Sequence, residues 1–330
     1  MPRDVEEMSP LLRGTVAALR RWIRWTQTSR ESVAAVERVV RACLMVPAFS
    51  LLLVILRVRA LRWGRPKVLG MTADGDTFQC RPPDLVQLYV WLFGVWEPDL
   101  TEFIRNRLDA GDTFVDVGAN IGVFTLLASH RVGPNGAVVA IEASRSVYRD
   151  LLETLEINGG PRNVRPVNVA AAESAKTLVV YSGPAENTGL TTTVASRGFA
   201  HEGTIPALPL GDILTDEETR NARLVKIDVE GGEPAVIAGM TQFLAHCRQD
   251  VEILIELSPH WWDAGTPAPS KVLEPLFRAG FNAYEIDNNY WPWRYVSPGR
   301  VARPRRVRWN LDDHIDRVDL VMSRVDGESL

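Results

Sequence analysis

The sequence predicts an α/β protein built on a mostly parallel, doubly wound sheet whose last strand runs antiparallel. Short apolar segments alternate with helical patterns from residue 113 onward. That alternation is typical of a parallel sheet with helices on both faces. The last two predicted strands are joined by about thirty residues without a helical pattern, which favours an antiparallel pair. Such sheets bind ligands at the carboxyl ends of their strands, so residues just after strands are the candidate site.

Each element follows from local pattern. Apolar residues at mixed spacings of three and four predict helices over 10–62 and 84–109, and Asp74-Gly75-Asp76 predicts a turn between two short strands. Short apolar runs predict strands at 113–117, 137–142, 163–170, 178–181, 224–229, 251–257, 281–286 and 318–322. Helices are expected at 121–130, 146–158, 234–244 and 270–279. Residues 183–204, rich in Gly, Thr, Ser and Asn, are expected to form a long loop.

Charge is distributed unevenly along the 330 residues. The net charge is −4, which gives no general attraction to nucleic acid, and no nucleic-acid partner is expected. Residues 1–67 contain thirteen Arg and Lys against five Asp and Glu, a net charge of +8, so the remainder carries −12. This asymmetry predicts an anionic partner for the first segment, such as a membrane surface. We divide the chain into an N-terminal helical extension, 1–66, and a catalytic domain, 67–330.

The location of the protein is predicted from its cysteines and from one apolar segment. Three scattered cysteines fit a reducing compartment, so a cytoplasmic location is expected. Residues 42–56 form an uncharged apolar run, shorter than the ~20 residues that cross a bilayer. This run could be a helix packed on the catalytic domain, a peripheral anchor or a true span. Its basic flank predicts peripheral contact with the inner face of the membrane through residues 42–67.

A glycine turn follows the strand at 113–117. Asp116, Gly118, Asn120 and Gly122 belong to this turn, in which glycine lets the backbone approach a ligand closely. The spacing is G-x-x-x-G rather than the G-x-G-x-x-G of dinucleotide-binding enzymes. The Asp116 carboxylate suits the ammonium or sulfonium group of a cationic amino-acid cofactor.

Acidic residues end two further strands. Glu142 lies about twenty residues beyond the glycine turn, where a carboxylate can accept hydrogen bonds from ribose hydroxyls. In the run 226–233, Lys226 and Asp228 share one strand face, as does Glu230 if the strand continues. Charged residues in a central strand are costly unless they pair or serve a site. Glu256 ends the next strand, and Trp261 and Trp262 beyond it are candidates either for an acceptor pocket or for core packing.

Together these blocks resemble the FkbM family of methyltransferases over about 89–324. The blocks, in order, are WEPDL at 96–100, FVDVGANIGVFTL at 114–126, IEAS at 141–144, ENTGLTT at 186–192, KIDVEGGE at 226–233 and ILIEL at 253–257. IEAS lacks the proline usual in its block. The resemblance implies a class I methyltransferase fold: a Rossmann-like, seven-stranded sheet that binds S-adenosylmethionine. It also implies a hydroxyl acceptor on a sugar, a lipid-linked glycan or a polyketide.

The resemblance assigns roles to the candidates. Asp116, Gly118, Asn120, Gly122 and Glu142 would hold the cofactor, with Glu97 as the carboxylate of the approach segment. Methyl transfer to an alcohol needs alignment and a base. Asp228 is the preferred base, Glu230 and Glu256 are alternatives, and Lys226 would orient Asp228 or stabilise an alkoxide.

Other functions remain open. The sequence shows no dedicated cluster of metal ligands, so we prefer direct base catalysis to metal-assisted catalysis. An NAD-dependent oxidoreductase would require a different glycine pattern. A catalytically inactive methyltransferase fold that acts as a binding or scaffold protein would be expected to lose the glycine turn or the strand-end acids, and both are present. Acceptor identity and oligomeric state are not encoded in any recognisable pattern.

Overall fold

The chain packs as two compact units. The computed structural model describes residues 10–26, 35–295, 303–313 and 315–330. The first unit lies within Met1–Thr101, Ala185–Gly189 and Asn288–Val301, and the second within Glu102–Pro184, Leu190–Asp287 and Ala302–Leu330. This grouping reflects packing alone, so the sequence division at residue 66 remains a prediction.

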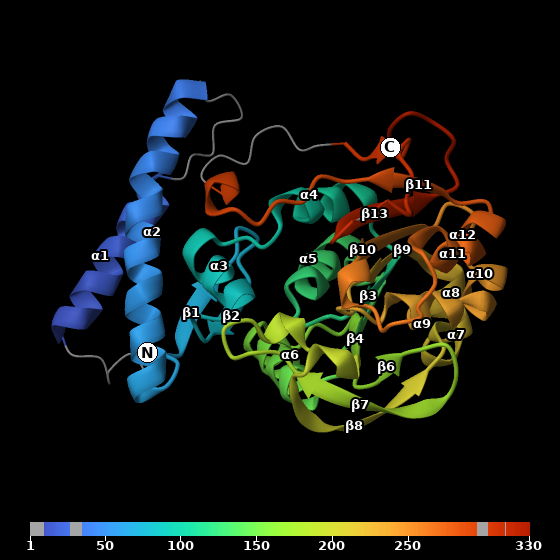
Figure 1. Cartoon of the computed structure of the whole chain (residues 1–330), viewed down its shortest axis with the longest axis horizontal. Coiled ribbons are helices and arrows are strands. Elements are labelled where there is room, and N and C mark those ends of the chain that lie inside the picture. The colour runs from blue at the N-terminus through green and yellow to red at the C-terminus, as the bar shows by residue number, and fades with distance from the viewer. Residues whose placement is uncertain (1–9, 27–34, 296–302, 314) are drawn as a thin grey trace. The chain divides into compact units, whose positions relative to one another are not determined.

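The first unit contains two long helices and a small hairpin (Figure 1). Its elements are α1 (Pro10–Thr26), α2 (Ala35–Trp63), β1 (Val68–Met71), β2 (Thr77–Cys80), α3 (Leu85–Phe93), the start of α4 (Pro98–Arg107) and η5 (Pro292–Tyr295). The strands β1 and β2 pair antiparallel across the turn that the sequence predicts at residues 74–76. Helix α1 packs along α2, and Phe49 of α2 contacts the rings of Tyr89 and Phe93 in α3.

The second unit is built on an eight-stranded sheet with the order β12-β11-β13-β10-β9-β3-β4-β5. Its strands are β3 (Thr113–Val117), β4 (Ala137–Ile141), β5 (Val164–Val167), β9 (Ala222–Ile227), β10 (Glu252–Leu257), β11 (Asn282–Glu285), β12 (Arg305–Arg306) and β13 (Val318–Ser323). Strands β5, β4, β3, β9 and β10 are parallel, and β13 runs antiparallel between β10 and β11. The predicted mostly parallel sheet with an antiparallel last strand is confirmed. The two-residue β12 makes eight strands rather than the predicted seven.

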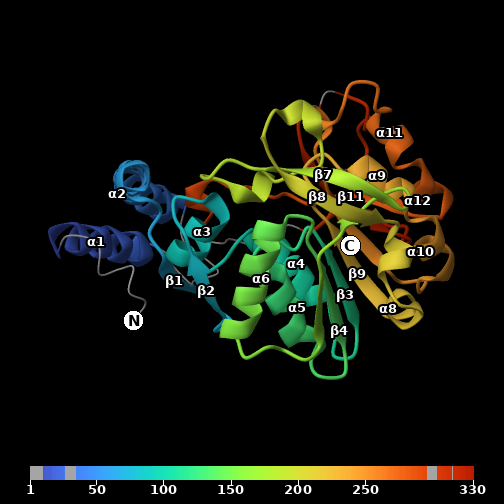
Figure 2. The same ribbon diagram turned by 90° about the horizontal axis from the view of Figure 1, so that it is seen from below.

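Helices cover both faces of this sheet (Figures 1 and 2). The helices are α5 (Val123–Val132), α6 (Arg145–Ile157), α7 (Leu210–Ile213), α8 (Asp216–Asn221), α9 (Glu233–Ala238), α10 (Thr241–His246), α11 (Pro269–Val272) and α12 (Glu274–Arg278). On one face, Val115, Val225 and Ile253 join a buried core with side chains of α9 and α10. Because strand side chains alternate between faces, Asp116 and Lys226 point to the other face, where α5 lies. The Lys226 ammonium is 5.2 Å from the Phe124 ring of α5.

A second, three-stranded sheet corrects part of the prediction. Its strands are β6 (Ala170–Ala171), β7 (Lys176–Ser182) and β8 (Ala200–Leu208), with β8 in the middle. The predicted loop over 183–204 was therefore wrong for its last residues, because Ala200–Leu208 pairs antiparallel with β7. Isolated small residues in Ala200–Leu208 obscured the strand pattern, and pairing with β7 compensates for their weak strand preference.

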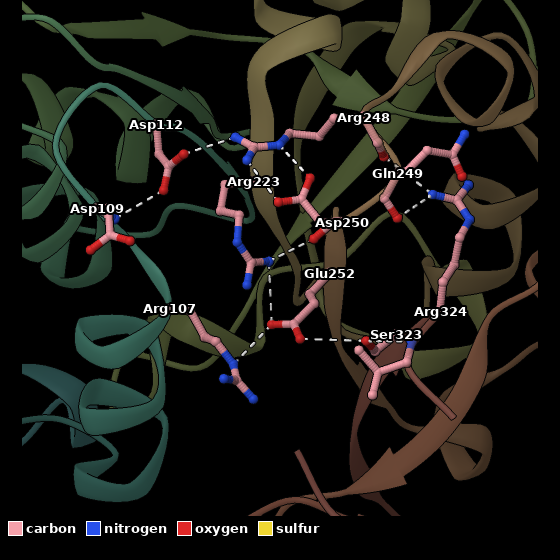
Figure 3. Close-up of polar contacts among 11 residues, drawn as sticks. Arg107, Asp109, Asp112, Arg223, Arg248, Gln249, Asp250, Glu252, Ser323 and Arg324 are labelled. Atoms are coloured by element: carbon pink, nitrogen blue, oxygen red, sulfur yellow. Dashed lines mark hydrogen bonds and ion pairs between the residues drawn. The ribbon is translucent and has the colours of Figure 1, made fainter. Parts of the chain in front are cut away.

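A network of charges joins the amino ends of the central strands (Figure 3). The buried carboxylate of Glu252, at the start of β10, lies 3.0 Å from Arg107 of α4 and 3.5 Å from Arg223 of β9. The Ser323 hydroxyl of β13 donates to the other oxygen of Glu252. Arg248 is 2.8 Å from Asp112, just before β3. The network connects four elements at the edge opposite the strand ends that carry the candidate site.

Candidate functional site

The glycine turn between β3 and α5 closes against two neighbouring strands. The backbone amides of Gly118 and Ala119 both donate to the Ile141 carbonyl at the end of β4. Gly118 has a φ of +83°, and a Cβ at this position would lie 1.8 Å from the Asp228 carbonyl oxygen. Gly122 has a φ of +89° and lies close to Leu151 of α6. Both glycines are therefore required by backbone conformation and by close approach.

Glu142 is held at the end of β4 by backbone amides. Its two carboxylate oxygens accept hydrogen bonds from Asn120 N at 3.0 Å and Ser144 N at 2.8 Å. Burial raises the pKa of Glu142 to about 7, although these two hydrogen bonds oppose the shift. Each carboxylate oxygen has a second lone pair, so the oxygens can still accept from ligand hydroxyls. This geometry fits the predicted contact with a ribose.

Asp116 is the buried carboxylate at the end of β3. Its Oδ2 accepts a hydrogen bond from the Thr125 hydroxyl at 2.7 Å. Its Oδ1 is buried and has no hydrogen-bond partner among the residues that the structure describes. Burial raises the pKa of Asp116 to about 6, with Lys226 acting in the opposite direction. An uncompensated buried oxygen of this kind is a ready acceptor for a cationic ligand group.

Lys226 and Asp228 form an ion pair beside this turn. The Lys226 Nζ donates to Asp228 Oδ2 at 2.8 Å, and the Lys226 side chain is almost fully buried. In the sheet, Lys226 is the register partner of Asp116 on β3. Asp228 N in turn donates to the Val117 carbonyl, which fixes Asp228 immediately past the strand. The structure therefore brings Asp116, Lys226 and Asp228 together, as the alternation of strand faces predicts.

Three acidic side chains converge at the carboxyl ends of β9 and β10. One carboxylate oxygen from each of Asp228, Glu230 and Glu256 lies within 4.8 Å of the others. Burial raises the pKa of Glu230 to about 8, and that of Glu256 well above its usual value, with the nearby Asp228 adding to both shifts. Such carboxylates share protons and titrate as a group. The sequence showed no metal-ligand cluster, but these three oxygens are a set that could hold a divalent cation.

Glu230 is fixed by residues that the sequence analysis missed. Its backbone has a φ of +53°, and its carbonyl accepts hydrogen bonds from the Thr192 hydroxyl at 2.8 Å and from Arg197 at 3.2 Å. Arg197 also lies 3.2 Å from Glu230 Oε2. Neither Thr192 nor Arg197 carries a sequence signal, because each is an isolated polar residue in a segment rich in small residues.

The tryptophans after β10 divide between two tasks. The Arg197 guanidinium lies 3.5 Å from the centre of a Trp261 ring, which is a stacking arrangement. Trp262 donates its indole N–H to Glu233 Oε2 at 2.7 Å, and Gly231 N donates to Glu233 Oε1. Burial raises the pKa of Glu233 to about 7. Trp262 therefore braces the loop after β9, whereas Trp261 covers the arginine that holds Glu230.

Glu97 belongs to the first unit and is described within it. Its backbone amide donates to the Tyr295 hydroxyl, and its Oε1 accepts from Asn288. The non-glycine residues with positive φ in the described chain are Glu97, Asn120 and Glu230. Such conformations cost energy and concentrate at functional sites. All three are residues that the sequence selects as candidates. The assignment of Glu97 to the cofactor stays a prediction.

The second unit thus has the features of a ligand-binding α/β protein. A glycine turn, an orphaned buried carboxylate oxygen and a strand-end glutamate lie at the carboxyl ends of β3 and β4. A lysine–aspartate pair and an acidic cluster lie beside them on β9 and β10. With β13 antiparallel between β10 and β11, this is the class I methyltransferase fold.

Comparison with known proteins identifies the family. The model of the methyltransferase FkbM domain matches residues 116–283, just over half of the chain. The chain belongs to the FkbM methyltransferase family. The match begins at Asp116 and includes every candidate residue of the second unit.

Individual relatives are distant. Hexuronic acid methyltransferase AglP of Haloferax volcanii is 26% identical over 148 residues, which are 45% of this chain and 58% of that protein. A methyltransferase FkbM structure from Methylobacillus flagellatus has 15% identity and a TM-score of 0.36, covering 72% of this chain and 52% of that one. A SAM-dependent O-methyltransferase from Thermotoga maritima has 14% identity and a TM-score of 0.38, covering 80% of both chains.

Proposed function

We propose that this protein is an S-adenosylmethionine-dependent methyltransferase that methylates a hydroxyl group. The observation that carries the proposal is the arrangement around the glycine turn. Gly118 leaves the space that a Cβ would fill, Asp116 has a buried oxygen without a partner, and Glu142 presents a carboxylate held by two amides. These features fit a cofactor that carries a positive charge and a ribose. Family membership independently supports the same cofactor.

Asp116, Gly118, Asn120, Gly122 and Glu142 would hold the cofactor. When bound, S-adenosylmethionine supplies an electrophilic methyl group on a sulfonium centre. Backbone amides fix the position of Glu142, and the ion pair with Lys226 fixes that of Asp228. This preorganisation aligns groups without a further entropic cost.

The acidic cluster supplies the base. Asp228 takes the proton from the acceptor hydroxyl at a carboxylate oxygen, and Glu230 and Glu256 are positioned to share that proton. Lys226, held against Asp228, orients the base and offsets negative charge on the acceptor oxygen. A divalent cation on the three carboxylates is the second way to acidify a hydroxyl, and the same residues would bind it.

The acceptor class is proposed to be a sugar hydroxyl, free or lipid-linked. The support comes from the AglP relative, whose name gives a hexuronic acid as its substrate. A polyketide hydroxyl is the alternative within the family. A cytoplasmic location, at the inner face of the membrane where a lipid-linked sugar would be presented, is part of this proposal.

The test is calorimetric titration of the purified chain with S-adenosylmethionine, S-adenosylhomocysteine and NAD. We expect saturable binding of the first two and none of NAD. Asp116→Asn should weaken S-adenosylmethionine binding by about tenfold or more, because a charge-assisted contact is lost. Glu173→Gln, an exposed acid in the same unit, is the matched control. Binding of neither adenosyl ligand would favour a scaffold role, and binding of NAD alone would overturn the proposal.

A further inference from the structure

Helix α2 presents an apolar outer face to the surroundings. Exposed apolar side chains project at helical spacing along it: Val36, Val40, Leu44, Leu51, Val54 and Val58. On a helix of 3.6 residues per turn, these six positions fall within an arc of about 80° and extend over about 33 Å. We call this set the α2 outer face. Contiguous exposed apolar surface of this length marks an interaction site rather than ordinary protein surface.

The opposite side of α2 is already used for packing. Met45, Ala48, Leu52 and Leu56 are buried at spacings of three and four. The segment Val39–Trp63 is long and apolar enough to cross a membrane, with a mean hydropathy of 2.5 in its most apolar window, yet only 22% of that window is buried. Length and composition alone would also fit a core helix. The low burial distinguishes α2 from a core helix and leaves its outer face without a protein partner among the described residues.

Charge complementarity indicates what covers the α2 outer face. Helices α1 and α2 together contain nine arginines and one glutamate, Glu37. That glutamate is paired with Arg41 at 2.8 Å. Arg57 and Arg62 are exposed at the carboxyl end of α2, and Arg21 is exposed on α1. An apolar strip with unopposed cationic side chains fits the surface of an anionic bilayer, where each basic residue adds attraction.

The packing of α1 favours docking in the membrane plane over crossing. Helix α1 lies along α2 and carries Arg13, Arg20, Arg21 and Arg24. If α2 crossed the bilayer, these four arginines would be carried into the hydrocarbon, which is costly. If α2 lies in the plane, α1 stays at headgroup level. Trp22 and Trp25, both exposed on α1, are then at the depth that tryptophan prefers.

We propose that the α2 outer face docks this protein in the plane of an anionic lipid bilayer. The apolar side chains enter the boundary between headgroups and acyl chains, while Arg57 and Arg62 contact lipid phosphates. Docking uses only the first unit and does not depend on the activity proposed above.

Co-sedimentation of the full chain with vesicles tests this proposal. Vesicles of phosphatidylcholine with added phosphatidylglycerol should pellet the protein, and phosphatidylcholine alone should bind roughly tenfold less. Leu51→Glu with Val54→Glu should lower binding to the anionic vesicles by at least about tenfold, because each change places a charge in the apolar strip. The matched control is Leu152→Glu with Ile157→Glu, which alters two equally exposed apolar residues of α6.

Other occupants would give different results. Arg57→Gln with Arg62→Gln should reduce the preference for anionic lipid while retaining weak binding to neutral vesicles. Equal pelleting of wild type and Leu51→Glu/Val54→Glu would overturn the proposal. So would a lipid-free dimer, seen by sedimentation velocity, that the same variant dissociates, because a second copy would then cover the face. Resistance of bound protein to alkaline carbonate extraction would indicate a span and would also overturn in-plane docking.

Discussion

Asp228 is the residue on which the proposed chemistry depends. It is held by Lys226 on one side and by its own amide on the Val117 carbonyl, so its carboxylate has a fixed direction. Two more carboxylates lie close enough to exchange a proton with it. A base fixed in this way requires no rearrangement before it accepts a proton.

Asp228→Asn should therefore lower turnover by about 10²–10⁴-fold while the dissociation constant for S-adenosylmethionine changes little. The asparagine keeps the shape and removes the base. Single-turnover methyl transfer to the acceptor, with cofactor binding measured in parallel, checks this expectation. Asp216→Asn, a change at a fully exposed aspartate, should have no effect on either quantity. Unchanged turnover in Asp228→Asn would transfer the role to Glu230 or Glu256.

At the residue scale, the sequence located the site but not all of its supports. Asp116, Asn120, Glu142, Lys226 and Asp228 follow strand ends in recognisable motifs, and β-strand alternation places them on one face. Arg197 and Thr192 could not be found in this way. Their contact with Glu230 depends on how a segment more than thirty residues earlier folds back over the site.

At the element scale, the amino ends of the central strands are joined by charge rather than by apolar contact. Glu252 is almost fully buried between Arg107 of α4 and Arg223 of β9, and Ser323 of β13 reaches it from the other side. Removing one partner of a buried network leaves the others without compensation. The network should therefore hold α4, β9, β10 and β13 in register.

Glu252→Gln should destabilise the protein by about 3 kcal/mol, because two arginines lose their counter-charge. Urea unfolding followed by tryptophan fluorescence measures the free energy of unfolding. Glu274→Gln disrupts an exposed set of pairs with Lys271 and Arg278 and should cost under about 0.5 kcal/mol. Similar losses in the two variants would show that the network adds no special stability. Cofactor binding by folded Glu252→Gln should be retained, since the network lies at the opposite edge of the sheet.

Element prediction succeeded where hydrophobic period and turn residues agreed. The strand at 113–117 was predicted to the residue, and the helix at 146–158 begins at Arg145 behind a Ser144 cap. The helices expected at 234–244 and 270–279 are each split in two, because the chain turns at Gly239 and at Leu273. Strand β8 was missed because its partner, β7, is what makes that segment extended.

At the scale of the whole molecule, the site stores unfavourable charge. The pKa of Asp116 is raised to about 6, those of Glu142 and Glu233 to about 7, and that of Glu230 to about 8, in each case mainly by burial. A folded state that binds protons more tightly than the unfolded chain is favoured at low pH. The contribution is fully present below the unfolded pKa values near 4 and is lost as pH rises through 6 to 8.

The cofactor-free protein should therefore unfold at a lower temperature at pH 8.5 than at pH 5.5. Glu142→Gln should reduce this slope, since a shift from 4.5 to about 7 corresponds to about 3 kcal/mol. The glutamine amide facing the Ser144 N–H adds a cost that is independent of pH, so it moves the curve without changing its slope. Thermal unfolding in matched buffers measures both. Glu217→Gln, at an exposed acid, should leave the slope as it is, and identical slopes for all three proteins would contradict the shift.

The position of β13 has a consequence for the order in which the protein can be made. This strand is wholly buried between β10 and β11, although it comes more than thirty residues after β11 in the chain. While the chain is still emerging from the ribosome, β10 exposes an apolar edge and β11 has no neighbour to pair with. The sheet can close only after residues 318–323 have been synthesised. Folding of the second unit must therefore follow translation of its last strand, and until then the open edge of β10 requires protection from aggregation.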